Sequence, residues 1–144
     1  SQRYLQLFDH YATTPYDFKA YRPQLVLINL GTNDYSTIIT PSVEQYVGAY
    51  VKLIELVRKQ YGPIPVICIR PHSAGAYLSA SFKVLQQRLS AHKDVHFAEF
   101  MPGIITVDKD LGASYHPNYS GQQKLCMTLV PLVSAVMGWE INHR

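Results

Sequence analysis

The sequence predicts an α/β fold with three layers, in which helices cover both faces of a parallel sheet. Two runs, residues 25–30 and 64–69, are apolar on both faces, which is typical of buried parallel strands. Segments with helical periodicity alternate with these strands. A β-α-β-α-β-α order requires right-handed crossovers and places helices on both sides of the sheet. With 144 residues and 47% apolar content, residues 1–144 are predicted to form a single domain around one core.

The first half of the chain contains a weak helical pattern, a strand and a long helix. Residues 1–11 have apolar side chains at roughly helical spacing, and Thr13-Thr14-Pro15 ends this pattern. The strand at residues 25–30 follows Arg22-Pro23. A helix is predicted to begin after Ser42, because Gln45 is placed to complete a capping box. Its apolar stripe continues to Gly62-Pro63, where the helix should end.

The second half repeats this alternation. Residues 64–69 form the next predicted strand and residues 76–91 the next helix. Residues 95–100 alternate with period two, which indicates a strand nearer an edge of the sheet. Residues 101–115 are predicted to be a loop, and residues 118–137 a final amphipathic helix.

The strand at residues 25–30 should have an unpaired edge if the three strands lie side by side. Its two apolar faces would be poorly covered by only three helices. The composition of a buried strand at the edge of a sheet therefore predicts a neighbour that these residues do not contain.

Composition excludes several classes of function. The net charge is +3, from 13 basic and 10 acidic residues, and it is scattered, so we expect no nucleic-acid or membrane partner. No apolar run is long enough to cross a bilayer. Cys68 and Cys126, the latter on the inward stripe of the last helix, are predicted to be buried free thiols, with a disulfide as the alternative. No spacing suggests a metal or a phosphate-binding loop, so no cofactor is expected.

The first candidate site is Gly31-Thr32-Asn33-Asp34, which directly follows the strand at residues 25–30. Reactive groups in open α/β sheets gather beyond the carboxyl ends of the strands. The Asn33 side-chain amide and a Gly31 backbone N–H are the donors that a developing oxyanion in acyl transfer needs. The alternative is an Asx turn that only terminates the strand.

The second candidate is His116, in a loop directly before the final helix. Asn118 is placed to cap that helix, and Pro117, which has no backbone N–H, cannot continue the hydrogen bonds of a preceding strand. An imidazole is suited to act as general base near neutral pH. His72 also follows a strand end, in Arg70-Pro71-His72, and competes with His116 for this role.

Taken together, the two motifs resemble those of SGNH (GDSL-like) hydrolases. The resemblance implies a flavodoxin-like fold, with Asn33 as oxyanion donor, His116 as base and Gly121 in the first turn of the following helix. The tail from Gly112 to Asn118, with Gly138-Trp139 after the last helix, resembles the carbohydrate acetylesterases of the second carbohydrate-esterase family. It implies that the chain is the C-terminal two-thirds of such a domain without its first strands, and it favours a secreted or periplasmic protein.

Two parts of the family pattern are missing from this sequence. Ala113 and Ser114 occupy the positions where the family usually has an aspartate. Either Asp110 therefore orients His116, or a backbone carbonyl does so and the site works as a Ser–His dyad. No serine lies in Gly-Asp-Ser or Gly-x-Ser-x-Gly. Ser36 is more consistent with a turn, and Ser73 is a weak candidate. The family's serine follows its first strand, which precedes both motifs of this sequence.

The sequence therefore predicts a serine esterase that is complete only with an N-terminal segment of the same domain. The expected substrate is a small ester or an O-acetylated carbohydrate, and the rings of Tyr35 and Tyr115, which flank the two motifs, are candidates to stack on a sugar. Two alternatives stay open: a non-catalytic flavodoxin-like binding module, in which both motifs serve only turns and caps, and a pseudoenzyme that has lost its nucleophile.

Overall fold

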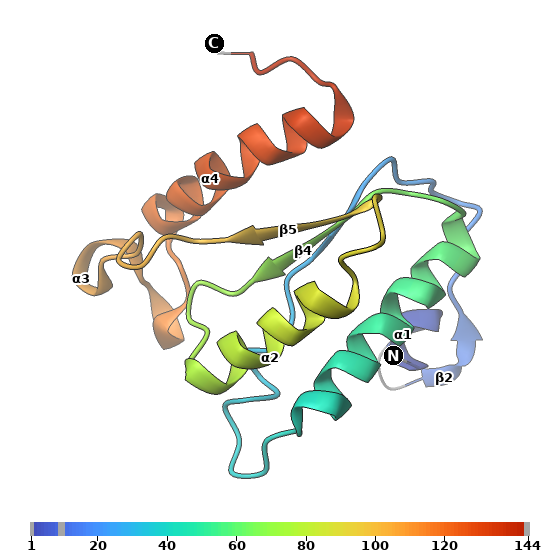
Figure 1. Cartoon of the computed structure of the whole chain (residues 1–144), viewed down its shortest axis with the longest axis horizontal. Helices are drawn as coiled ribbons and strands as arrows, with labels where there is room; N and C mark the ends of the chain where they lie inside the picture. Colours follow the sequence, from blue (N-terminus) through green and yellow to red (C-terminus); the bar gives the residue numbers. More distant parts are fainter. Residues whose placement is uncertain (1, 9–10, 143–144) are drawn as a thin grey trace.

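A parallel three-stranded sheet lies between two layers of helices in the computed structural model, which describes residues 2–8 and 11–142 (Figure 1). The strands are β3 (Val26–Ile28), β4 (Val66–Arg70) and β5 (Val95–Glu99), in the order β3-β4-β5. The helices α1 (Val43–Tyr61) and α2 (Ala76–Arg88) cover one face, and α4 (Tyr119–Met137) covers the other. The predicted α/β fold with a parallel sheet is confirmed.

Helix α1 begins where the capping box predicts. The Ser42 hydroxyl accepts a hydrogen bond from the Gln45 backbone N–H at 3.2 Å, and the Gln45 side chain accepts one from the Ser42 N–H at 2.8 Å. The helix ends at Gly62, whose N–H donates to the Arg58 carbonyl at 2.8 Å. Its inward stripe is buried, with Tyr46, Val47, Tyr50, Ile54 and Val57 at most 6% exposed.

The sheet separates two hydrophobic cores, because successive residues of a strand point to opposite faces. Val66 and Cys68 of β4 face α1 and α2, whereas Ile67 and Ile69 face α4. Strand β4 pairs with both neighbours, Val66 opposite Val26 in β3 and opposite Val95 in β5. The central strand is therefore buried on both faces, as its composition predicts.

Strand β3 is covered on only one face. Ile28 faces α1 and α2 and is 5% exposed, whereas its neighbour Leu27 faces the side of α4 and is 48% exposed. Helix α4 packs on Ile67 and Ile69 of β4 and on Ala98 of β5, and Leu27 is not part of this core. The predicted poor coverage holds for the face of Leu27 and not for the face of Ile28, and in the described part of the chain no strand pairs with the free edge of β3.

Three predictions about local structure were wrong. The weak helix predicted at residues 1–11, of which residues 1, 9 and 10 lie outside the described residues, contains a short 3-10 turn (Gln2–Leu5) and an antiparallel pair, β1 (Gln6–Phe8) and β2 (Tyr11–Pro15). A short isolated helix is marginal, and the tyrosine and threonines of β2 favour a strand. The predicted loop at 101–115 contains two short helical turns, α3 (Val107–Asp110) and η2 (Ala113–Tyr115).

The third error concerns Cys126, which was predicted to be buried. Cys68 is buried, but Cys126 is exposed, and both are free thiols. Cys126 lies on the flank of α4 that faces the uncovered side of β3 and lines the groove between them, which leaves its thiol exposed. None of the helices in the described residues is long and apolar enough to cross a membrane.

Candidate active site

One pocket of about 630 Å³ lies beyond the carboxyl ends of β3 and β4 and brings both predicted motifs together. Asn33 lines it from the loop after β3, and His116 lines it from the loop before α4. Two sequence-distant groups thus share one cavity, as reaction chemistry at the end of a parallel sheet requires. The other lining residues are Asn29, Leu30, Gly31, Thr32, Asp34, Pro71, His72, Ser73, Ser114, Tyr115, Pro117, Gln122 and Leu125.

Two tyrosines of α1 hold the strand end from which the Asn33 loop departs. The Tyr50 hydroxyl donates to the Ile28 carbonyl at 2.8 Å, and the Tyr46 hydroxyl donates to the Leu30 carbonyl at 3.2 Å. Burial raises the pKa of both phenols, so both stay protonated and remain donors at any physiological pH. These bonds tie the end of β3 to α1 and fix the start of the loop.

Gly31 is required at the first position of this loop. Its φ of 122° lies in a region that residues with a Cβ rarely adopt. A Cβ at this position would also lie 2.7 Å from Leu78 Cδ1 and 3.0 Å from Tyr46 Cε2. The loop therefore packs directly on α1 and α2, and Asn33 is exposed above it.

The loop that carries His116 is closed by its own backbone. The Gly112 N–H donates to the His116 carbonyl at 2.8 Å, and Leu111 forms an antiparallel bridge with Pro117. At its tip, Ser114 and Tyr115 have φ angles of 53° and 60°. Two consecutive non-glycine residues in the left-handed region store strain of about 1–3 kcal/mol each. This conformation leaves Tyr115 79% exposed at the pocket.

Asp110 is buried and does not contact the His116 imidazole. Its carboxylate accepts hydrogen bonds from Lys124 Nζ at 2.6 Å, from the Thr106 N–H at 2.7 Å and from the Ser120 hydroxyl at 2.8 Å. These donors, that of Lys124 foremost, hold the pKa of Asp110 well below its usual value. Of the two groups predicted as possible partners of the base, the carboxylate is therefore occupied elsewhere.

His72 is a second imidazole in the same pocket, at the end of β4. Burial lowers its pKa, and the nearby His116 lowers it further. Ser73 also lines the pocket, whereas the Ser36 hydroxyl donates to the Asn33 carbonyl at 3.0 Å within a turn. Asn29 was not among the predicted site residues, although its signal was visible as the single polar residue in the apolar run 25–30.

The two tyrosines proposed for sugar binding differ in their placement. Tyr115 lines the pocket. Tyr35 points inward instead: its hydroxyl is hydrogen-bonded to the Ser81 hydroxyl at 2.8 Å, and its ring packs edge-on against Tyr46, with 5.5 Å between the centroids. Tyr35 thus supports the Asn33 loop from below. In residues 2–8 and 11–142, no cluster of three metal-binding side chains occurs.

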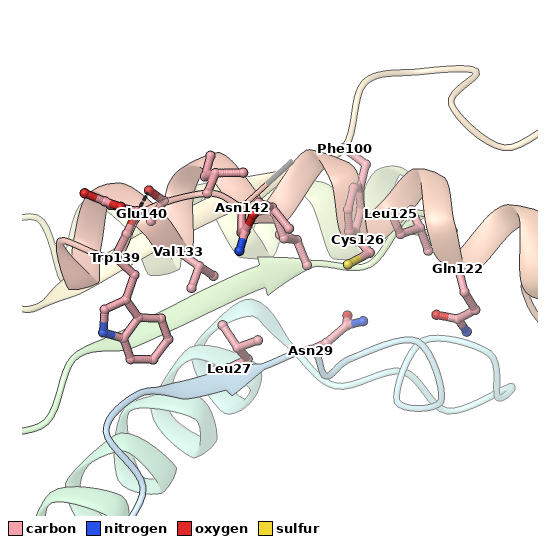
Figure 2. Close-up of a pocket in the computed structure, with 14 residues that line it drawn as sticks. Leu27, Asn29, Phe100, Gln122, Leu125, Cys126, Val133, Trp139, Glu140 and Asn142 are labelled. Atoms are coloured by element: carbon pink, nitrogen blue, oxygen red, sulfur yellow. Dashed lines mark hydrogen bonds between the residues drawn. The ribbon is translucent and has the colours of Figure 1, made fainter. Parts of the chain in front are cut away.

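An apolar groove of about 480 Å³ adjoins the pocket, and Asn29 lies in the lining of both. Figure 2 shows Leu27 of β3 and Asn29, directly after this strand, facing α4 across the groove, with Trp139 at its far end. Leu129, Val130 and Val133 of α4 also line it. The groove thus runs along the uncovered face of β3, and its lining is mostly apolar.

Comparisons with known proteins agree with the predicted family. No protein-family model matches the chain. Over 135 residues, the chain is 30% identical to cellulase/esterase CelE of Acetivibrio thermocellus, an alignment that covers 90% of this chain and 16% of CelE.

Two of the solved structures that share the fold are family two carbohydrate esterases. A family two carbohydrate esterase from Clostridium thermocellum, in complex with cellohexaose, is 29% identical with a TM-score of 0.81, and the match covers 96% of this chain and 43% of that one. A family 2 carbohydrate esterase with a carbohydrate binding domain from Corynascus thermopiles (Myceliophthora fergusii) is 24% identical with a TM-score of 0.74, covering 96% and 45%. The predicted resemblance to family two carbohydrate esterases is confirmed, and the chain spans less than half the length of these relatives.

Proposed function

Since the chain is related in sequence and fold to the family two carbohydrate esterases, we propose that it belongs to a serine esterase that removes O-acetyl groups from a carbohydrate. His116 is the general base and Asn33 donates to the oxyanion. The observation that carries this proposal is that Asn33 and His116 line one pocket at the carboxyl ends of the strands.

The two groups have complementary tasks in acyl transfer. The His116 imidazole accepts the proton of the attacking hydroxyl and returns it to the leaving sugar alcohol. The Asn33 amide, with the Gly31 N–H beside it, stabilises the negative charge that develops on the carbonyl oxygen. Loss of one such donor typically costs about 2.7–4 kcal/mol of transition-state stabilisation.

A Ser–His dyad is the form of the site that the hydrogen bonds favour. The Asp110 carboxylate is already bonded to Lys124, Thr106 and Ser120, so it is not available to the base. No hydrogen bond of the described residues involves the His116 side chain, so the carbonyl that orients its imidazole in the proposed dyad belongs to the complete domain. Such a carbonyl fixes the tautomer but stabilises an imidazolium less than a carboxylate does.

The nucleophilic serine belongs to a further segment of the same domain, N-terminal to this chain. Two observations support this part of the proposal. The free edge of β3 and the half-exposed Leu27 offer backbone and apolar surface to an additional strand. A strand added there would end beside the pocket, because the groove and the pocket share Asn29. The proposed catalytic site is complete only with this segment.

The exposed ring of Tyr115 is the proposed contact for the sugar. It lies next to His116 and is held outward by its left-handed backbone. Aromatic rings with one free face stack on the apolar faces of sugars. The cellohexaose complex of the Clostridium thermocellum relative supports a carbohydrate as the substrate class. Tyr35 is left out of this role because its ring packs into the core.

The test measures hydrolysis of 4-nitrophenyl acetate and of an acetylated oligosaccharide, by this chain alone and by the chain extended with the coding sequence upstream of it. We expect turnover only from the extended protein. His116→Ala should lower its kcat by about 10⁴-fold or more, and Asn33→Ala by about 10²–10³-fold. His92→Ala, which removes an exposed histidine far from the pocket lining, is the matched control and should leave kcat unchanged.

Three results would reject or revise the proposal. An upstream sequence without a strand followed by Gly-Asp-Ser or Gly-Asn-Ser would favour a binding module, and carbohydrate affinity without turnover in the extended protein would indicate a pseudoenzyme. Turnover by the present chain that Ser73→Ala abolishes would move the nucleophile to Ser73, which lines the same pocket.

A further inference from the structure

We propose that Asp110 is a positioning residue for His116, which it holds in place through the loop rather than by contact with the imidazole. This inference rests on the proposed role of His116 as the base. It assigns a function to a buried carboxylate that the dyad does not use.

The first observation is the isolation of the Asp110 carboxylate from solvent. Asp110 is 0% exposed, and every partner of its carboxylate belongs to a segment that flanks the His116 loop. Thr106 lies before the loop, whereas Ser120 and Lys124 lie on the first two turns of α4 after it. A buried charge is stable only while its partners stay in place, so the carboxylate ties both flanks of the loop together.

The second observation is that the backbone of Asp110 also holds α4. The Asn118 N–H donates to the Asp110 carbonyl at 2.8 Å. Gly121 packs against the same carbonyl so closely that an added Cβ would lie 2.3 Å from its oxygen. The Asn118 side-chain amide donates to the Lys109 carbonyl at 2.8 Å and to the Leu111 carbonyl at 3.3 Å. Asp110 and Asn118 thus form the closed neck of the loop.

The third observation concerns His116 itself. Among the hydrogen bonds of the described residues, only its backbone takes part: its N–H donates to Ala113 at 3.1 Å, and its carbonyl accepts from Gly112 at 2.8 Å. The exposed side chain has no protein partner that restrains it within this described part of the chain. The position of the His116 side chain in the pocket is therefore determined by the loop backbone. That backbone is held in turn by the contacts of Asp110 and Asn118 at the closed neck of the loop.

The test uses this chain and follows two signals that do not require turnover: amide hydrogen exchange of residues 111–117 and the NMR resonance of the His116 imidazole. Asp110→Asn removes the charge that Lys124 pairs with. We expect exchange in the loop to accelerate by roughly tenfold or more and the His116 resonance to move or broaden. Lys124→Met should act in the same direction, and Lys124→Arg, which keeps the charge, should restore the wild-type values.

The matched control is Val57→Ala, a core truncation in α1 on the opposite face of the sheet. It should lower global stability without changing the resonance of His116. Equal effects of Asp110→Asn and Val57→Ala on the loop, compared at equal global stability, would overturn the proposal. If Asp110→Asn does not fold, Ser120→Ala and Lys124→Met decide by the same criterion.

Activity of the extended protein supplies an independent arm. Asp110→Asn should lower kcat while leaving KM unchanged, because the base is displaced but the sugar contact is kept. Absence of turnover in every form of the protein would reject the proposed function, whereas the exchange and NMR results would still decide whether Asp110 positions His116.

Discussion

Replacing Gly121 with alanine should destabilise the protein, although the same replacement at Gly48 should stabilise it. Both glycines lie within long helices, and alanine in place of a helical glycine typically adds about 0.4–1 kcal/mol of stability. A Cβ at Gly48 meets nothing within 4 Å. A Cβ at Gly121 lies 2.3 Å from the backbone oxygen of Asp110, about 1 Å inside ordinary van der Waals contact.

The neighbour of Gly121 is backbone, so it cannot move aside as a side chain would. That oxygen also accepts the hydrogen bond from the Asn118 N–H, which any displacement weakens. Overpacking of this kind costs about 1–3 kcal/mol. Because the gain in helix propensity is common to both variants, the difference between Gly121→Ala and Gly48→Ala measures this clash directly.

The assay is urea unfolding followed by far-UV circular dichroism, with midpoints compared at equal slopes. Gly48→Ala should raise the midpoint, and Gly121→Ala should fall below Gly48→Ala by the free energy of the clash. Equal midpoints for the two variants would refute the close packing of α4 on the loop neck, and with it the geometric basis for the role of Asp110.

Burial and charge lead to three further predictions. Burial raises the pKa of the Cys68 thiol to about 12, so Ellman's reagent should label only Cys126 in the native protein and both thiols in urea. Rapid labelling of two thiols in the native protein would contradict this prediction. Since the folded pKa of Asp110 lies below its unfolded value, its stabilisation is complete above about pH 4 and is lost as the pH falls further. Unfolding curves from pH 6 to 2.5 should therefore fall more steeply for the wild type than for Asp110→Asn, and parallel curves would count against the buried ion pair. On β3, Ile28→Ala should lose about 2–4 kcal/mol, and Leu27→Ala less than about 1 kcal/mol, by the same unfolding assay; similar losses would mean that the Leu27 face of β3 is also covered.

Periodicity and capping predicted the long helices and the sheet well, because both signals are local. The capping box at Ser42 and the glycine at position 62 mark the ends of α1 within one residue of their observed positions. The run at residues 25–30 predicted a strand with too little cover, and the exposure of Leu27 confirms it. Local patterns of this kind depend on neighbours within one turn or one strand, which a single sequence contains.

Sequence patterns are least informative where the decisive contact is distant in sequence. The inward turn of Tyr35 depends on Ser81, which lies 46 residues away in α2. The exposure of Cys126 depends on which strands α4 covers, and helical periodicity alone does not tell this. The N-terminal strand pair shows that weak helical periodicity is a poor predictor of a helix. A segment of about ten residues with few apolar side chains at helical spacing has too little intrinsic stability to form one.

The candidate site could be predicted in its residue types but not in its connections. Polar residues directly after a buried strand and a histidine before a capped helix indicated the same edge of the sheet, and the pocket contains both Asn33 and His116. The partners of Asp110 could not be predicted, because its distance of six residues from His116 was compatible both with contact and with its absence. Only the positions of Lys124 and Ser120 show that the Asp110 carboxylate turns away from His116.

The two loops of the pocket rest on different cores. The loop of Asn33 is held by Tyr46 and Leu78 of the core beneath α1 and α2, whereas the loop of His116 leads into α4, whose Leu125 belongs to the core on the other face. Substitutions in one core should thus alter one half of the site and combine additively with substitutions in the other. Selection can therefore adjust the proposed oxyanion donor and the proposed base one at a time, which gives this architecture two independent routes to a new ester specificity.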